Sequence, residues 1–217
     1  MKNQASLQAK NISWYLPLYE AALKGDWESA NRFFDLHPDA IIVKLPQVHM
    51  TALHIAVGAG HSNPFVEKLV ELMPLKALQL QTEEGDSALA YAAITGNTTA
   101  AKIIIRKDPN LPNMQDAKGK IPLRYATQHG HRETLLYLLS VTNDNVIPGS
   151  ALVEVIKDPI NAGFYYVALL LLQRNPDLAN WKETFVKVRP LYILARAPST
   201  FQSGRSLTFW QHLVYKR

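Results

Sequence analysis

The most informative feature of the sequence is an apolar residue that returns about every 35 positions. It ends a triplet at six anchor positions: Leu18, Leu53, Leu89, Leu123, Ile156 and Leu191, which are 35, 36, 34, 33 and 35 residues apart. Three residues after each of the first four anchors stands an alanine, and seven residues after each of the first five stands a glycine. An anchor and an alanine at i and i+3 share one face of a helix, and glycine takes the positive φ that ends one. Each repeat is therefore predicted to open with a short helix that ends at a glycine.

A second helix is predicted after each glycine, because apolar residues recur four, five, eight and nine positions later. In the third copy these are Ala100, Ala101, Ile104 and Ile105. A proline thirteen residues after the glycine ends this helix in three copies, at Pro38, Pro109 and Pro176. In the second copy the proline and the apolar set both slip by one, so one residue is inserted near Asn63.

A helix pair of this size cannot bury its apolar face alone, so neighbouring pairs must stack around one elongated core. The sequence therefore predicts an all-α solenoid of about five to six helix-pair repeats. The last two are divergent, because they lack the alanine and the sixth has Pro198 in place of the glycine. Tetratricopeptide and HEAT repeats compete at this period, but the former need a Trp and Leu-Gly signature that is absent, and the latter are longer.

The repeats resemble ankyrin repeats in their motifs. Thr51-Ala52-Leu53-His54-Ile55-Ala56 is similar to the hexapeptide T-P-L-H-x-A, and residues 87–92 and 121–126 are degenerate copies. Gly60-His61 and Gly130-His131 match the Gly-His before the second helix. The resemblance implies an ankyrin-repeat solenoid. It also implies that His54 hydrogen-bonds backbone between repeats.

The whole chain also resembles plant ankyrin-repeat proteins of the accelerated-cell-death type. Residues 18–27, 164–169 and 194–201 carry this likeness. It implies a role in defence or stress signalling, and a soluble N-terminal part of a membrane protein or a relative without the membrane domain. The expected organisation is an N-terminal segment (1–15), four ankyrin repeats (16–142), and divergent repeats with a basic C-terminal cap (143–217).

The resemblance also indicates where a protein or peptide partner would bind. In ankyrin arrays the first helices line a concave face, and the loops between repeats project from its edge as fingers. The predicted partner-binding residues are Leu23, Lys24, Val48, Met50, Ala59, Glu84, Asp86, Ile94, Lys118, Lys120, Gln128 and His129. Exposed apolar side chains among them favour docking. The alternative is that they pack against adjacent fingers.

Composition supports a folded chain: 47% of the residues are apolar and 19% are charged. There is no cysteine, which excludes disulfides and thiolate metal sites and favours a reducing compartment. The N-terminus lacks the apolar core of a secretory signal, and the longest apolar run, residues 164–172, is too short to span a bilayer. We expect a cytoplasmic protein, on the cytosolic face of a membrane if a membrane segment follows.

The net charge of +5 comes from one end of the chain. Residues 181–217 hold seven Lys or Arg and one Glu, whereas residues 1–180 are nearly balanced. With no basic stripe along the repeats, nucleic-acid binding is not expected. The basic end, with Phe209, Trp210 and Tyr215, either caps the last repeat or contacts anionic lipid, which would make the chain a membrane-linked regulatory domain.

The sequence is also expected to show any motif for catalysis, cofactor binding or metal binding, and few candidates occur. No nucleophile elbow, phosphate loop, dinucleotide fingerprint or zinc-protease motif occurs, so we predict a protein that is not an enzyme and uses no cofactor. His129 and His131 are two apart and would face different directions on a helix, so no metal site is expected. His61 and His131 are instead expected to cap or terminate helices. The acids at 83, 84 and 86 are interpreted as a solvated cluster.

Overall fold

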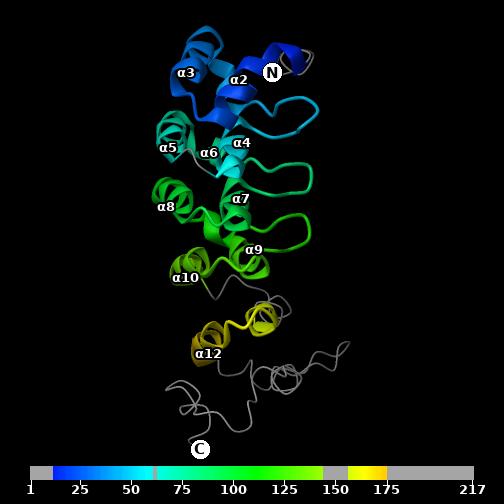
Figure 1. The fold of residues 1–217 in the computed structure, drawn as a ribbon, viewed down its shortest axis with the longest axis vertical. Helices are drawn as coiled ribbons and strands as arrows, with labels where there is room; N and C mark the ends of the chain where they lie inside the picture. The colour runs from blue at the N-terminus through cyan, green and yellow to red at the C-terminus, as the bar shows by residue number, and fades with distance from the viewer. Residues whose placement is uncertain (1–11, 61–62, 144–155, 175–217) are drawn as a thin grey trace, which may run out of the picture.

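The structure, a computed structural model, describes residues 12–60, 63–143 and 156–174. These residues form two adjacent columns of helices along the long axis, with loops projecting from one side (Figure 1). The first helices of the repeats are α2 (Ile12–Lys24), α4 (Ala52–Ala59), α7 (Ala88–Thr95) and α9 (Pro122–Gln128), and residues 156–161 are also helical. The second helices are α3 (Trp27–Leu36), α5 (Asn63–Leu72), α8 (Thr98–Lys107), α10 (Arg132–Val141) and α12 (Tyr165–Arg174). Short turns of helix follow the second helices: η1 (Pro38–Ile42), α6 (Leu75–Leu78) and η2 (Leu111–Asn113). The predicted all-α class is confirmed.

Local sequence explains where the helices begin. Thr51 starts α4 with a capping box, in which its hydroxyl accepts from the His54 amide and the His54 ring accepts from the Thr51 amide. The Ser87 hydroxyl caps α7 by accepting from the Ala90 amide, without a capping box. α9 begins with Pro122, whose fixed φ suits the first helical position. Among the second helices, Asp26 caps α3 and Asn97 caps α8.

The recurring glycines end the first helices as predicted. All five have positive φ, from 72° at Gly25 to 80° at Gly163. Gly60 and Gly96 are themselves the left-handed C-caps of α4 and α7. The alanines of the register, at 21, 56, 92 and 126, are buried, so neighbouring first helices can approach closely.

The second helices also follow the prediction. The apolar pairs of α8 are buried, and in α5 the buried set is Phe65, Val66, Leu69 and Val70, shifted by one residue as the proposed insertion requires. α3, α5 and α8 end before Pro38, Pro74 and Pro109. Together with the first helices they enclose one continuous core that reaches from Tyr15 to Leu171.

The N-terminal end departs from the expected organisation in one respect. α2 begins at Ile12, before residue 16, where the first repeat is predicted to begin, and it holds Pro17 inside it. Trp14 packs edge-on against Phe33 of α3 with ring centroids 5.0 Å apart, and Tyr15 is fully buried. The first helix of the array therefore gains an extra turn that covers the end of the core. The sixth copy, Pro176 and His61 lie outside the described residues, as does the basic C-terminal end.

Within residues 12–60, 63–143 and 156–174, no helix is both long enough and apolar enough to span a membrane.

Candidate partner-binding surface

Three hairpin-like fingers project from the column of first helices. We number each finger after the repeat that follows it: finger 2 (residues 43–51), finger 3 (79–87) and finger 4 (114–121). Each closes with a backbone hydrogen bond: Leu45 N to Met50 O (2.7 Å), Thr82 N to Asp86 O (2.9 Å) and Asp116 N to Lys120 O (2.9 Å). The "finger surface" below means these fingers with the exposed ends of α2, α4, α7 and α9.

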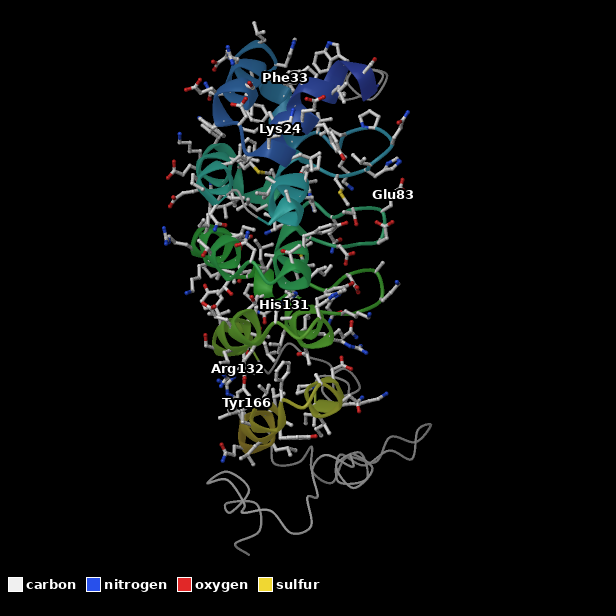
Figure 2. All side chains as sticks on the ribbon, viewed as in Figure 1. Lys24, Phe33, Glu83, His131, Arg132 and Tyr166 are labelled. Atoms are coloured by element: carbon white, nitrogen blue, oxygen red, sulfur yellow. The ribbon has the colours of Figure 1, made fainter. Side chains whose placement is uncertain are left out.

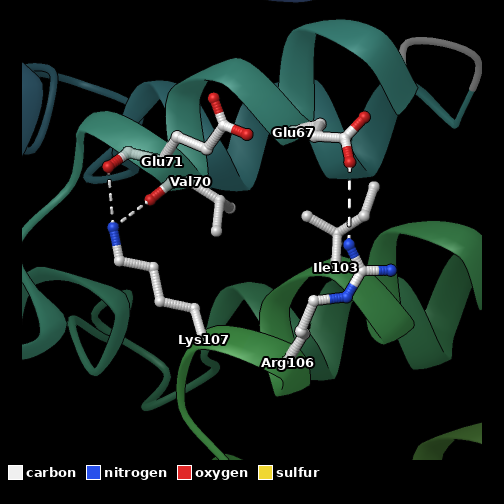
Figure 3. Close-up of a pocket in the computed structure, with 6 residues that line it drawn as sticks. All are labelled: Glu67, Val70, Glu71, Ile103, Arg106 and Lys107. Carbon is white, nitrogen blue, oxygen red and sulfur yellow. Dashed lines mark hydrogen bonds and ion pairs between the residues drawn. The ribbon is translucent and has the colours of Figure 1, made fainter.

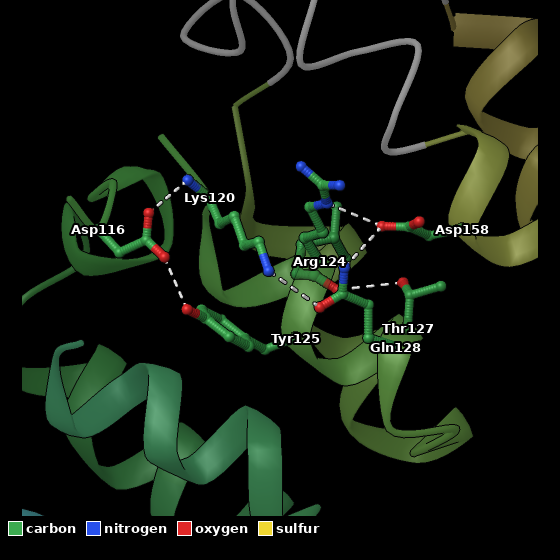
Figure 4. Close-up of polar contacts among 8 residues, drawn as sticks. Asp116, Lys120, Arg124, Tyr125, Thr127, Gln128 and Asp158 are labelled. Carbon is green, nitrogen blue, oxygen red and sulfur yellow. Dashed lines mark hydrogen bonds and ion pairs between the residues drawn. The ribbon is translucent and has the colours of Figure 1, made fainter. Parts of the chain in front are cut away.

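Asp116 organises finger 4. One of its carboxylate oxygens accepts from the amides of Lys118 and Lys120, both at 2.7 Å, and the other lies 2.6 Å from the Tyr125 hydroxyl (Figure 4). Burial acts to raise the pKa of Asp116, but these hydrogen bonds and the Lys120 charge outweigh it and hold the pKa below its usual value. The carboxylate is therefore ionised and fixes the loop.

His54 joins α4 to finger 3. Its side chain is almost fully buried, with the residue 2% exposed. Nε2 lies 3.2 Å from the Asp86 carbonyl and Nδ1 lies 2.7 Å from the Thr51 hydroxyl, so Nε2 must carry the hydrogen of a neutral ring. Burial lowers the pKa of His54 to about 4. The predicted backbone contact between repeats is confirmed.

The fingers also contact one another. His49 Nδ1 lies 3.0 Å from Glu83 Oε1, which joins the tips of fingers 2 and 3, and Glu83 stands at the outer edge in Figure 2. Gln81 donates from Nε2 to the Gln115 carbonyl at 2.8 Å. Gly85 has a φ of 87°, and a Cβ there would overlap the backbone of Ala117. The fingers thus form one close-packed layer.

None of the twelve predicted partner-binding residues is fully buried. Leu23, which is 38% exposed, and Lys24, Glu84, Lys118, Gln128 and His129 are exposed, whereas Val48, Met50, Ala59, Asp86, Ile94 and Lys120 are half-buried. Val48 and Met50 pack against the core, so only part of each side chain is exposed to a partner. The fingers do bring acidic and basic residues side by side. The role of these residues in binding remains a prediction.

Sequence reasoning missed two tyrosines on this surface. Tyr91 lies against Gly58, where a Cβ would stand 3.4 Å from its ring, and its ring meets His54 edge-on at 5.7 Å. The Tyr125 hydroxyl contacts carboxylates of two fingers. Both occupy the variable position of the hexapeptide, so tyrosine there in two successive copies was the available signal.

The prediction for His129 and His131 was wrong in its geometry. They do not share a helix, because α9 ends at Gln128 and α10 begins at Arg132. Gly130, with a φ of 75°, reverses the chain between them, and their rings stand nearly parallel at 6.3 Å. His131 occupies the N-cap position of α10 but makes no side-chain cap there. Its Nε2 instead bonds the Ile94 carbonyl near the end of α7 at 2.8 Å, so it helps to terminate the preceding repeat's helix.

Polar contacts also join repeats away from the fingers. Arg124 Nε donates to Asp158 at 2.8 Å, linking α9 to residues 156–161, and both side chains are mostly buried (Figure 4). A shallow crease separates α5 and α8 (Figure 3). There, the Lys107 ammonium donates to the carbonyls of Val70 and Glu71. It thus satisfies backbone acceptors in the last turn of α5.

Within residues 12–60, 63–143 and 156–174, no three His, Cys, Asp or Glu side chains are grouped so that they could hold a metal ion.

Comparisons with known proteins agree with this geometry. Residues 53–147 match the model of ankyrin repeats, in three copies. The chain is 34% identical over 98 residues to a putative ankyrin repeat protein of Rickettsia bellii (strain RML369-C). The aligned segment covers 44% of this chain and 58% of that protein. The chain thus spans little more than half the length of this curated relative.

A solved structure shows the same fold. A chain in the crystal structure of the yeast ribosomal protein Rps3 in complex with its chaperone Yar1 superposes with a TM-score of 0.54, over 61% of this chain and 95% of that one. At 20% identity this likeness concerns the fold alone. The helix pair α2–α3 precedes the matched segment and stacks on it in the same manner (Figure 1). Residues 53–147 are therefore ankyrin repeats, and the described helix pairs form an all-α ankyrin-repeat solenoid.

Proposed function

We propose that this chain is a non-catalytic scaffold that binds a protein or peptide partner through its finger surface. The observation that carries the proposal is the layer of fingers. Hydrogen bonds and close packing hold the fingers together, yet their tips differ in chemistry: Glu83 and Glu84 are exposed on finger 3, and Lys118 on finger 4. A surface fixed before binding loses little conformational entropy when a partner docks.

The comparisons support a protein partner. The chain has the repeat architecture of ankyrin proteins, and the structural neighbour comes from a complex of a ribosomal protein with its chaperone. Opposite charges on adjacent fingers favour a partner with a complementary pattern, which would fix its register and speed its association.

Charge reversal on the fingers tests this proposal. We expect Glu84→Lys combined with Lys118→Glu to remove most of the proteins that the wild-type chain captures from its native tissue. Both side chains are exposed, so helix content and melting temperature should stay unchanged. These positions suit the test better than Met50, whose packing against the core would add a loss of stability.

The matched control is a double reversal on the outer helices, Asp35→Lys with Arg106→Glu, at two exposed positions away from the fingers. It should capture the same proteins as the wild type. Equal capture by the finger variant and this control would remove the finger surface as the docking site.

The finer proposal, a role in plant defence or stress signalling, rests on the sequence resemblance of residues 18–27, 164–169 and 194–201. It would be abandoned if loss of the protein left such responses unchanged.

A membrane-linked regulatory role is the alternative, and the seven basic residues among residues 181–217 favour it. Co-sedimentation with anionic vesicles that weakens with salt would support it. Equal binding to neutral vesicles would exclude it.

A further inference from the structure

The second helices change in chemistry along the array. In α5, α8, α10 and α12, two residues follow the first pair of buried side chains and begin the opposite side of the helix. They are Glu67-Lys68, Lys102-Ile103, Leu136-Tyr137 and Leu169-Leu170. The first two pairs contain charged residues, whereas the last two are wholly apolar or aromatic. A helix side that faces water normally carries polar residues, so α10 and α12 depart from the pattern of the array.

Two of these leucines are open to solvent. Leu136 is 37% exposed and Leu170 is 39% exposed, and the other two members of the apolar pairs are half-buried. The share of the core that α10 contributes comes from residues 134, 135, 138 and 139, which are buried without them. Neighbouring exposed leucines at positions that the core does not use indicate contact with another molecule.

The two exposed leucines lie next to each other across the seam between α10 and α12, which are neighbours in the column of second helices (Figure 1). One turn before them, Arg132 Nε lies 3.3 Å from the Tyr166 hydroxyl oxygen. One turn after them, Arg174 donates to the Leu139 carbonyl. These contacts join early residues to early and late residues to late, so the helices run in the same direction. The leucines therefore fall side by side between the two contacts.

Cations surround the leucines. Arg132 and Arg174 stand one turn away from them, and the Lys102 ammonium of α8 lies 5.5 Å from the centre of the Tyr137 ring. Glu133 is the one acid in α10 and α12. An occupant of this surface must therefore be apolar at its centre and negatively charged at its edges.

We propose that the apolar pairs of α10 and α12 form a second docking surface, the outer leucine patch, which binds an acidic amphipathic helix of a partner protein. An apolar stripe of helical period on that helix would cover the leucines, and acids beside the stripe would meet the cations. The outer leucine patch belongs to the second helices, whereas the finger surface belongs to the loops and first helices. The proposal therefore goes beyond finger binding and does not depend on it.

Charge disfavours an occupant from the chain itself. Residues 181–217 hold seven Lys or Arg and one Glu, so the cations around the patch would repel them. Two copies that met patch to patch would bring the same cations together. A lipid surface is disfavoured by shape, because both leucines keep more than half of their surface within the protein, whereas insertion buries an apolar face in the bilayer.

Site-specific photocrosslinking tests the occupant in the full chain. A photoreactive benzoylphenylalanine in place of Leu136 should crosslink, in an extract of the native tissue, to a segment of another protein. Mass spectrometry should map that segment to an apolar stripe of helical period in which acids outnumber bases. The matched control carries the same group in place of Glu28, an exposed residue of α3, and should not crosslink to that segment.

A synthetic peptide with the mapped sequence then measures what the patch contributes. Leu136→Glu should weaken its binding to the purified chain roughly tenfold, because a central apolar contact is lost and a like charge meets the acids. Circular dichroism should show unchanged helix content, since the position is exposed. Glu84→Lys, on finger 3, should bind the peptide as the wild type does, so failure of this proposal and failure of the finger surface are distinguishable.

The proposal is overturned if the crosslinks from position 136 fall on residues 144–155 or 175–217 of the chain, on a second copy, or on lipid. A mapped segment without an excess of acids overturns it as well, as does a peptide whose affinity survives Leu136→Glu. Crosslinking at position 136 that does not exceed the control at position 28 has the same consequence.

Discussion

At the residue scale, two repeat glycines have the same backbone conformation but different surroundings. Gly60 and Gly96 have φ values of 79° and 73°. A Cβ on Gly60 would meet nothing within 4 Å, whereas a Cβ on Gly96 would overlap the ring of His131. That ring also bonds the Ile94 carbonyl, so it cannot move without losing a hydrogen bond. Gly96 is required for space as well as for backbone freedom.

We therefore predict unequal costs for the two alanine variants. Gly60→Ala should lower the free energy of unfolding by about 1–2 kcal/mol, the cost of a left-handed non-glycine residue. Gly96→Ala should cost about 3 kcal/mol, because the displaced His131 also forfeits a hydrogen bond. Urea denaturation measures both. Gly96→Ala combined with His131→Ala should cost less than the two single changes together, and simple additivity would show that the ring is not the obstacle.

These residues also show which structural features could be predicted from the sequence and which could not. The positive φ of the register glycines, the buried alanines and the contact of His54 with backbone all follow from position within the repeat, and all were predictable. The parallel rings of His129 and His131 were not, because they depend on the turn at Gly130. The contacts of Tyr125 were missed because they require the spacing between two fingers, which no pattern within one repeat encodes.

At the element scale, basic side chains join each second helix to its neighbour. Lys107 of α8 reaches the last carbonyls of α5, and Arg174 of α12 reaches the Leu139 carbonyl of α10 at 2.8 Å. Both stand eighteen residues after their anchors, so the same contact recurs in two copies of the repeat. The guanidinium carbon of Arg132 lies 5.3 Å from the centre of the Tyr166 ring. Figure 2 labels these two neighbouring residues. Cations thus supplement the apolar contacts between second helices.

The contact of Lys107 should contribute measurably to stability. We predict that Lys107→Met lowers the free energy of unfolding by about 1–2 kcal/mol, because the charge-assisted bonds to the Val70 and Glu71 carbonyls and the interaction with the helix dipole are lost. Thermal denaturation followed by circular dichroism measures the change. Lys118→Met, at an exposed lysine, should shift stability by less than about 0.5 kcal/mol. Equal effects of the two variants would mean that Lys107 adds no more than a surface charge.

At the scale of the whole molecule, the helices contact one another within each repeat and between neighbouring repeats along the elongated core. Each first helix packs on the next one, α2 on α4, α4 on α7 and α7 on α9. In such an array the free energy of unfolding is close to a sum of the contributions of single repeats and of the interfaces between them. A destabilising substitution should therefore loosen mainly its own repeat and the adjacent ones. The mostly buried pair Arg124–Asp158 lies at the interface that joins α9 to residues 156–161.

Asp158→Asn therefore tests whether the array behaves in this local way. Loss of the carboxylate weakens its bonds with Arg124 and Gln128, a change worth about 1–2 kcal/mol. Hydrogen exchange should show the amides of residues 156–174 opening roughly 5- to 30-fold more often, while those of α4 and α5 keep their protection. Glu20→Gln, which removes an exposed pair with Lys24 at the other end, should change neither region. If protection fell equally in α4 and in residues 156–174, the solenoid would unfold as one unit, and its repeats could not be treated as nearest-neighbour blocks.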